Sequence, residues 1–313
     1  MKTFIQVFIF IVCFGHLQAQ TKTVVPNVFF ILPTQIGSGP SFACVSLSEI
    51  FDYDAEQDSL YLPDLSAYTS DTAAEVQFIP LGEPYRSRFL KGCGIKQGDS
   101  LFVYSYLNQR LQSFSINQCG VAAVLNPYGG FMPLNAEDYM FCLTLETSAF
   151  QGFEFNFTHT FVSVGVRNPF YSGSVKNVVW QNSSEAEIPI QLKYTIDSAY
   201  SGPVKLFSVH RYEQDGYQFF IQNFEENTMH DSEIRVKVLS VIGKKSGELI
   251  CQHILYTGES ASFAGPEEQY AGILFNNLPP VIFGLQYESF GCPAIYFLDN
   301  QLDSLRLKCD NRH

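Results

Sequence analysis

Four acidic side chains alternate with other residues over a short stretch in the first third of the chain: Asp52, Asp54, Glu56 and Asp58. Carboxylate oxygens are the ligands that a hard cation such as Ca²⁺ prefers. The spacing differs from that of an EF-hand loop, because Gln57 stands where that loop needs glycine and Pro63 where it needs glutamate. We interpret the cluster as a solvated acidic turn between two strands, with a calcium site completed by distant residues as the alternative.

A candidate nucleophile lies in the segment Gly258-Glu259-Ser260-Ala261-Ser262. This segment resembles the Gly-Glu-Ser-Ala-Gly of carboxylesterases, which would imply an esterase with Ser260 as its nucleophile. Ser262 replaces the last glycine, however, and Gly265-Pro266 interrupts the helix that should follow. Only His313 follows as a candidate base, so we interpret the segment as a surface turn.

The internal histidines are scattered, at His159, His210, His230 and His253. None has the spacing of a zinc site, although Cys251 and His253 share one face of an expected strand. We therefore predict no catalytic, metal or cofactor-binding residues.

Two sequons predict N-glycosylation, at Asn156-Phe157-Thr158 and at Asn182-Ser183-Ser184. Asn156 lies on the polar face of an expected strand, and Asn182 lies in an expected polar loop.

The N-terminus has the order of a secretory signal peptide. Met1-Lys2-Thr3 is followed by an apolar run from Phe4 to Phe14 and then by a short segment ending Ala19-Gln20. The run is shorter than the roughly twenty residues that cross a bilayer. We predict a cleaved leader over residues 1–20 and a secreted, extracellular protein.

Seven cysteines lie beyond Cys13 of the leader, and all are disulfide candidates in an oxidising compartment: Cys44, Cys93, Cys119, Cys142, Cys251, Cys292 and Cys309. An odd number leaves one cysteine free or available to another chain. The assumption that disulfides stay within a domain favours Cys44 with Cys93 and Cys119 with Cys142.

The formal net charge is −12 at pH 7. An acidic surface repels phosphate, so nucleic acid and anionic membranes are not expected partners. No stretch after the leader is long enough to predict a membrane span.

The elements that must position these residues are strands, because the 29 phenylalanines and 17 tyrosines make the chain rich in aromatic residues and several segments alternate with period two. From Phe153 to Phe161 four phenylalanines share one face, and from Ile188 to Ile196 apolar residues alternate around Pro189, which predicts an edge strand. Two hairpins are predicted, one joined by Asp215-Gly216 and one joining Ile234–Ile242 to Leu249–Tyr256.

Regularly spaced short strands predict an all-β fold of two disulfide-bearing β-sandwich domains, CUB-like or jelly-roll-like in architecture. The length after the leader suits two cores. Asn168-Pro169 breaks the pattern, so we predict an N-terminal β domain over residues 21–167 and a C-terminal β domain over residues 168–313.

These expectations favour a non-enzymatic extracellular recognition protein that binds a protein or a glycan. One alternative is a secreted hydrolase whose dispersed acidic residues converge in three dimensions. Another is a structural or matrix component that uses the odd cysteine for an interchain bond.

Overall fold

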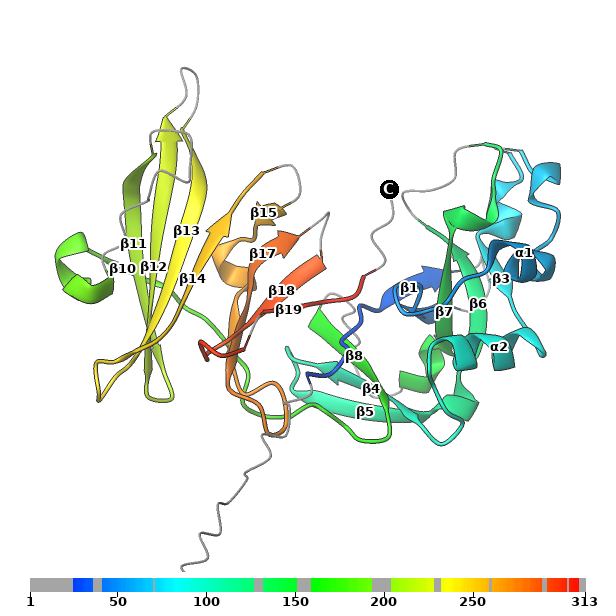
Figure 1. Ribbon diagram of the computed structural model, residues 1–313, viewed down its shortest axis with the longest axis horizontal. Coiled ribbons are helices and arrows are strands. Elements are labelled where there is room, and N and C mark those ends of the chain that lie inside the picture. Colours follow the sequence, from blue (N-terminus) through cyan, green and yellow to red (C-terminus); the bar gives the residue numbers. More distant parts are fainter. Residues whose placement is uncertain are drawn as a thin grey trace, which may run out of the picture.

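The computed structural model describes residues 25–35, 41–69, 71–126, 132–150, 159–192, 204–227, 232–258, 261–288, 292–302 and 304–309. This part of the chain is mostly antiparallel β-structure (Figure 1). The predicted leader and Asn156 lie outside the described residues, as does most of the predicted strand from Phe153 to Phe161.

The first sheet, sheet I, lies in the N-terminal half of the chain. In spatial order its strands are β1 (Leu32–Gln35), β2 (Ser41–Ser46), β7 (Tyr139–Glu146), β6 (Gly120–Leu125) and β3 (Phe78–Pro80). Two α-helices, α1 (Ala55–Asp58) and α2 (Tyr85–Gly92), lie beside it. Sheet II has three strands, which are β5 (Arg110–Ser115), β4 (Ser100–Ser105) and β8 (Thr160–Gly165).

Sheet III is built from short segments near the C-terminus. Its strands run β19 (Leu305–Arg306), β18 (Cys292–Phe297), β17 (Val281–Glu288), β16 (Tyr270–Gly272) and β9 (Lys176–Asn177), with β15 (Ala261–Phe263) also paired to β17. Sheet IV has longer strands, in the order β10 (Gln181–Ser183), β11 (Val204–Gln214), β12 (Tyr217–Asn227), β13 (Ser232–Gly243) and β14 (Leu249–Tyr256).

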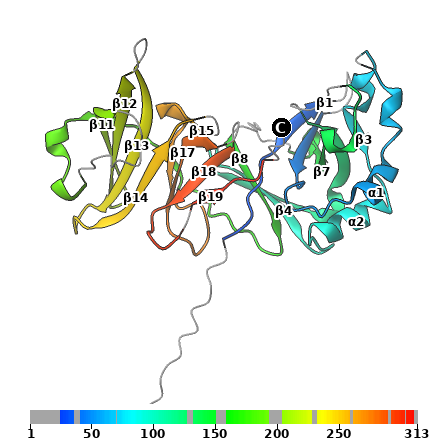
Figure 2. The ribbon, with the colours of Figure 1, turned by 45° about the horizontal axis from the view of Figure 1, so that its top comes forward.

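The four sheets follow one another along the long axis of the molecule, and the same order is visible from two directions (Figure 1 and Figure 2). The side chains of a single strand alternate between two faces, and the core that each face joins shows how the sheets pack. Leu101 and Val103 of β4 belong to a core shared with sheet I, whereas Phe102 and Tyr104 belong to a core shared with sheet III. Sheet II is therefore buried on both faces, as continuous apolar strands require.

Sheet III is a second two-sided layer. Val281 and Phe283 of β17 pack toward sheet II, and Ile282 and Leu285 pack toward sheet IV. Strict alternation would place Leu285 on the face of Phe283, but it lies on the opposite face. The alternation therefore breaks at Gly284, whose φ is +75°. A Cβ there would overlap the carbonyl oxygen of Glu268, so this bend requires glycine.

The two ends of the described chain lie together between the halves. Phe29 bridges to Lys308 on one side and to Val162 of β8 on the other. The Lys308 N–H donates to the Val28 carbonyl at 2.8 Å, and the Cys309 N–H donates to the Glu49 carboxylate at 2.8 Å. The C-terminal segment thus joins sheet III to the N-terminal half.

The structure confirms a mainly β chain with antiparallel sheets and a disulfide, and it confirms both predicted hairpins, as β11–β12 and β13–β14. Asp215 and Gly216 form the β11–β12 turn with φ values of +48° and +88°, as expected for a tight hairpin turn. The predicted domain boundary at 167/168 falls between β8 and β9 and stays a prediction; the core between sheets II and III contains residues from both sides of it.

The strand predicted from Ile188 to Ile196 is wrong over the residues that the structure describes. Residues 185–187 and 190–192 form two 3₁₀ turns instead. Pro189 accepts a hydrogen bond from the Leu192 N–H, and Ile188 and Leu192 pack on the outer face of sheet IV, whereas Ile190 is exposed. Local turn chemistry therefore overrides the alternating pattern.

Within these described ranges, no helix has the length and apolar character needed to cross a bilayer.

Candidate functional site

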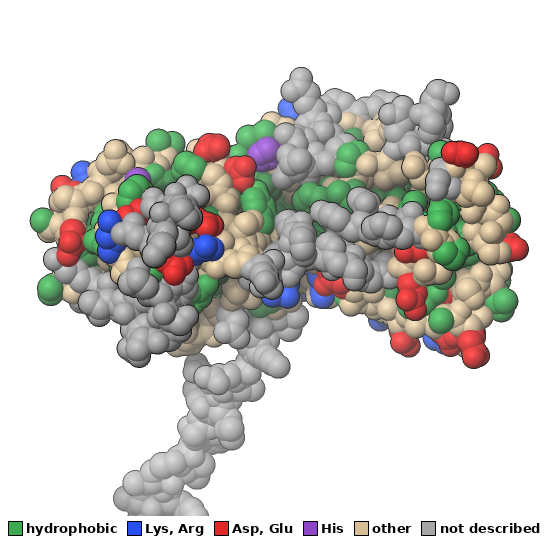
Figure 3. All heavy atoms as spheres, turned by 90° about the horizontal axis from the view of Figure 1, so that it is seen from above, with side chains coloured by type: hydrophobic (Ala, Val, Ile, Leu, Met, Phe, Trp, Pro, Cys, Tyr) green, Lys and Arg blue, Asp and Glu red, His purple; other side chains and the backbone are tan. Residues whose placement is uncertain are grey.

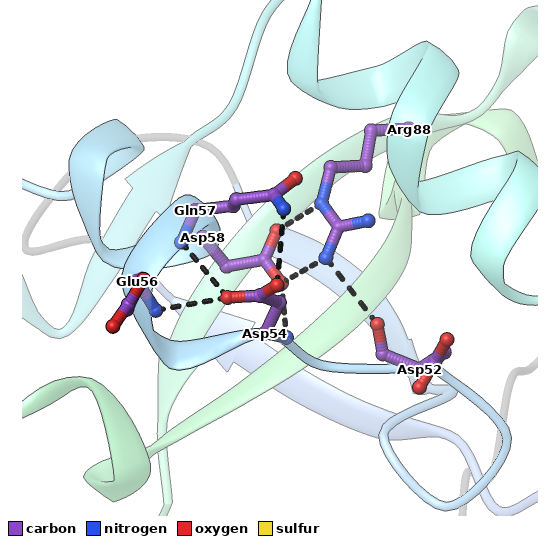
Figure 4. Close-up of polar contacts among 6 residues, drawn as sticks. All are labelled: Asp52, Asp54, Glu56, Gln57, Asp58 and Arg88. Atoms are coloured by element: carbon purple, nitrogen blue, oxygen red, sulfur yellow. Dashed lines mark hydrogen bonds and ion pairs between the residues drawn. The ribbon is translucent and has the colours of Figure 1, made fainter.

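The acidic cluster around α1 uses two of its carboxylates within the fold (Figure 4). Asp54 caps α1 by accepting from the N–H groups of Glu56 and Gln57 at 3.0 and 3.1 Å. Asp58 is fully buried and forms a bidentate pair with Arg88 of α2, with both N–O distances 2.6 Å. These bonds raise the pKa of Arg88, mainly through the side-chain hydrogen bonds that it donates to Asp58.

Asp52 contributes only its backbone to this arrangement, since its carbonyl oxygen accepts from Arg88 at 3.3 Å. Among the residues that the structure describes, no group of three histidine, cysteine or acidic side chains could hold a metal ion. The geometry gives Asp54 and Asp58 a role in joining α1 to α2, in place of the solvated turn that we expected.

The structure does not supply the context of an esterase serine. Ser260 lies outside the described residues, but Gly258 forms a bridge with Ala261, and Ala261–Phe263 is strand β15. A nucleophile elbow requires a helix directly after the serine. The residues that follow Ser260 thus form a strand and not a helix, and the surface turn itself stays a prediction.

One disulfide is formed, between Cys292 and Cys309, which lie 17 residues apart. The other five described cysteines are not part of a disulfide, namely Cys44, Cys93, Cys119, Cys142 and Cys251. The preferred pairings of Cys44 with Cys93 and of Cys119 with Cys142 are therefore not formed.

Strand alternation explains the missing pairs. Cys44 and Cys142 point to the outer face of sheet I, whereas Cys93 and Cys119 contact the core on its inner face. Each preferred pair would have to pass through the sheet. Burial raises the pKa of Cys44 and of Cys119 to about 11, so these thiols are poor nucleophiles.

The remaining sequence candidates are dispersed. Asn182 lies on the edge strand β10, not in the expected loop, and its side chain is exposed. His253 contacts the carbonyl oxygen of Phe297 at 3.3 Å, and burial lowers its pKa. His210 contacts the Ser208 hydroxyl at 3.2 Å.

A pocket opens between sheets III and IV, at the end that carries the β11–β12 turn, and its volume is about 490 Å³. Small-molecule sites are typically about 300–1,000 Å³. Buried Phe219 and Leu298 contribute to its lining. Tyr171 and Ile273 also line it and remain 46% and 37% exposed. The pocket thus combines an apolar lining with an aromatic ring that solvent can reach.

Polar side chains lie on one side of this pocket. The Gln214 amide donates to Asp215 at 2.9 Å and to the Ala271 carbonyl at 3.2 Å, and it accepts from the Tyr212 hydroxyl at 2.8 Å. The Lys176 ammonium lies 3.6 Å from the Asp215 carboxylate, and both side chains are more than half exposed. This pair offers both hydrogen-bond donors and acceptors to a ligand.

Backbone geometry brings the segment before β9 close to β16 within sheet III at this point. Gly272 has a φ of +143°, and a Cβ there would overlap the Ser174 carbonyl oxygen. The Ser174 hydroxyl in turn accepts from the Ile273 N–H at 3.2 Å. The segment before β9 can therefore pass directly against β16 and form one wall of the pocket.

None of the lining residues of this pocket was predicted as a site residue. The hairpin signal placed Asp215 at a turn, but no sequence signal relates that turn to Tyr171 or Lys176. The proximity follows only from the packing of sheet III on sheet IV.

Neither a protein-family model, nor a curated protein, nor a solved structure matches this chain.

Proposed function

We propose that the protein is a secreted, non-enzymatic recognition protein that binds a glycan in the pocket between sheets III and IV. The observation that carries the proposal is the accessible Tyr171 ring beside the Asp215–Lys176 pair in a pocket of about 490 Å³. Sugar rings present apolar C–H faces and hydroxyl groups. The apolar faces suit an aromatic ring, and the hydroxyl groups suit paired donors and acceptors.

The proposal includes the predicted export, the use of the Asn182 sequon and an architecture of two sandwiches, CUB-like or jelly-roll-like. Sheets I and II share one core and sheets III and IV share another, which supports two sandwiches, and a third core packs these two against each other through sheets II and III. The exposed side chain of Asn182 on an edge strand supports glycosylation at that position. Material found in the growth medium with an N-terminus near residue 20 would support export.

A glycan array on the full-length secreted protein, followed by calorimetry on the best ligand, tests the function. We expect Tyr171→Ala to weaken binding about tenfold, because it removes the stacking surface, which corresponds to about 1.4 kcal/mol. Asp215→Asn should weaken binding as well, since asparagine tolerates the positive φ of this position and removes only the charge.

Tyr256→Ala is the matched control, because Tyr256 of β14 is 43% exposed and does not line the pocket. Equal affinities of wild type and Tyr171→Ala would contradict the proposed site. An array without any bound glycan would contradict the proposed ligand class and would leave a protein ligand as the recognition hypothesis to test.

A further inference from the structure

A second pocket, of about 500 Å³, opens at the opposite end of sheet IV, beyond β15. Phe207, Ile234 and Phe263 supply apolar walls, and Lys237, Glu225 and Glu233 supply charge. Figure 3 looks down on this end of the molecule, where acidic and basic side chains lie intermixed over sheet IV. This pocket is separate from the proposed glycan pocket, because the two share no lining residue.

Two interruptions of the sheet shape this pocket. The pairing of β11 with β12 shifts between Leu206 and Ser208, and the pairing of β12 with β13 shifts between Phe224 and Glu225. The first shift takes Phe207 out of the ladder, and its ring is 60% exposed. Bulges of this kind redirect side chains and are frequent next to functional sites.

Lys237 has an unusual environment in this pocket. It lies on the same face of β13 as Leu239, toward the interior, and its ammonium lies 4.5 Å from the centroid of the Phe263 ring. The basic groups near it form ion pairs, Lys205 with Glu225 at 3.0 Å and Arg235 with Glu233 at 2.9 Å. Among the described residues, no carboxylate pairs with Lys237.

The groups opposite Lys237 do not compensate for its charge either. Asn223 of β12 is its register partner, and the Asn223 Oδ1 atom is buried and accepts no hydrogen bond. His210 of β11 adds a further basic group, and its pKa is lowered by burial and then by Lys237. Burial lowers the pKa of Lys237 to about 8. A substantial share of this amine is therefore neutral near physiological pH, unlike an ordinary lysine.

The charged side chains that line the second pocket favour a neutral ligand. Glu225 and Glu233 are already paired with Lys205 and Arg235, so a charged ligand would have to compete with these ion pairs. A neutral molecule with an apolar body fits the walls formed by Phe207, Ile234 and Phe263. A desolvated lysine in an apolar pocket is a nucleophile toward carbonyl carbon.

We propose that Lys237 is a reactive amine that captures neutral, apolar aldehydes in this second pocket as reversible imines. The amine nitrogen adds to the carbonyl carbon, and the carbinolamine then loses water to form the C=N bond. The carbonyl oxygen leaves as water together with the two amine hydrogens, so no oxidant or reductant takes part. Hydrolysis returns the free lysine and the aldehyde.

Reductive trapping tests the proposal on the full chain. The protein is incubated at pH 7.5 with benzaldehyde and cyanoborohydride, and the modification rate of each lysine is measured by peptide mass mapping. We expect Lys237 to react about tenfold faster than Lys244, an exposed lysine paired with Glu213, because burial lowers the pKa of the Lys237 amine. The anionic 4-carboxybenzaldehyde should react more slowly than benzaldehyde at Lys237, because its carboxylate loses hydration in the pocket and Lys205 and Arg235 are already paired.

Lys237→Arg keeps the positive charge but removes the nucleophile, so it should abolish the fast phase, whereas Lys244→Arg should keep it. A Lys237 rate equal to or below that of Lys244 would overturn the proposal. So would a fast phase that persists in Lys237→Arg. If Lys237→Arg does not fold, the site-resolved rates of the wild-type protein decide alone, and they do not depend on glycan binding in the first pocket.

Discussion

Two charged side chains, one in each half of this molecule, have opposite environments. In the N-terminal half, the buried carboxylate of Asp58 meets the Arg88 guanidinium in a bidentate pair and also accepts from the Asp54 N–H at 2.7 Å. In the C-terminal half, Lys237 lies over a phenylalanine ring without a carboxylate partner among the described residues, beside an unsatisfied Asn223 oxygen.

The difference separates a structural role from a functional one. A satisfied buried pair holds α1 against α2 and leaves no polar group for a ligand. A partly buried ammonium without a carboxylate partner destabilises the fold, and such groups persist where activity requires them. Both pockets described above adjoin sheet IV, which agrees with this division.

Of the three changes that test this comparison, removal of the Asp58 carboxylate should change the free energy of unfolding most. We expect Asp58→Ala to lower the free energy of unfolding by about 3–4 kcal/mol, because it leaves Arg88 unpaired. Urea unfolding measures the change. Asp58→Asn keeps the shape and should cost less, and Glu56→Gln, at an exposed position, should change stability little. A loss below about 1 kcal/mol for Asp58→Ala would show that the pair is not structural.

Removal of the disulfide should cause the next largest loss of stability. The disulfide joins β18 to the C-terminal segment, which contacts Glu49 and Val28 of the other half. A loop of 17 residues predicts a loss of about 3 kcal/mol for Cys292→Ser with Cys309→Ser. Thermal unfolding with and without reductant checks this value. If the double variant unfolds in two separate steps, the C-terminal segment is what couples the halves; a single unshifted transition would contradict a stabilising role.

Removal of the Lys237 amine should change the free energy of unfolding less, and it should stabilise the protein. Lys237→Met should raise the free energy of unfolding by about 2 kcal/mol at pH 7, because the folded state no longer buries an ammonium. The folded pKa of about 8 lies below the unfolded value of 10.5, so the penalty in the wild type is fully present below pH 8. It disappears as the pH rises toward 10.5, where the two proteins should become equally stable. A Lys237→Met variant that is less stable at pH 7 would show that the ammonium has a partner.

The hairpins could be predicted from the sequence because their signals are local. Asp215-Gly216 tolerates the positive φ angles of the turn, and Val236, Val238 and Ile242 do share a face. The same period failed at Ile188, where Pro189 and a capping box between Ser184 and Glu187 favour 3₁₀ turns. Apolar residues at every second position share a face only if the segment forms a strand.

The candidate sites could not be predicted in this way. Lys237 occupies the polar side of an alternating strand, which usually faces water, but here sheet III covers that side. The disulfide pairing failed for a related reason, since neighbouring positions along a strand point to opposite faces of sheet I and only the fold shows which cysteines share a face.

The sequence by itself determined that this chain is mainly β and where two of its hairpins turn, because strand period and turn chemistry act over a few residues. The order in which the four sheets stack, and with it both pockets, the buried Asp58–Arg88 pair and the unpaired Lys237, was decided only by tertiary structure. Burial of both faces of sheets II and III depends on contacts between segments far apart in the chain. The local sequence pattern of a segment does not indicate which distant segment it will contact.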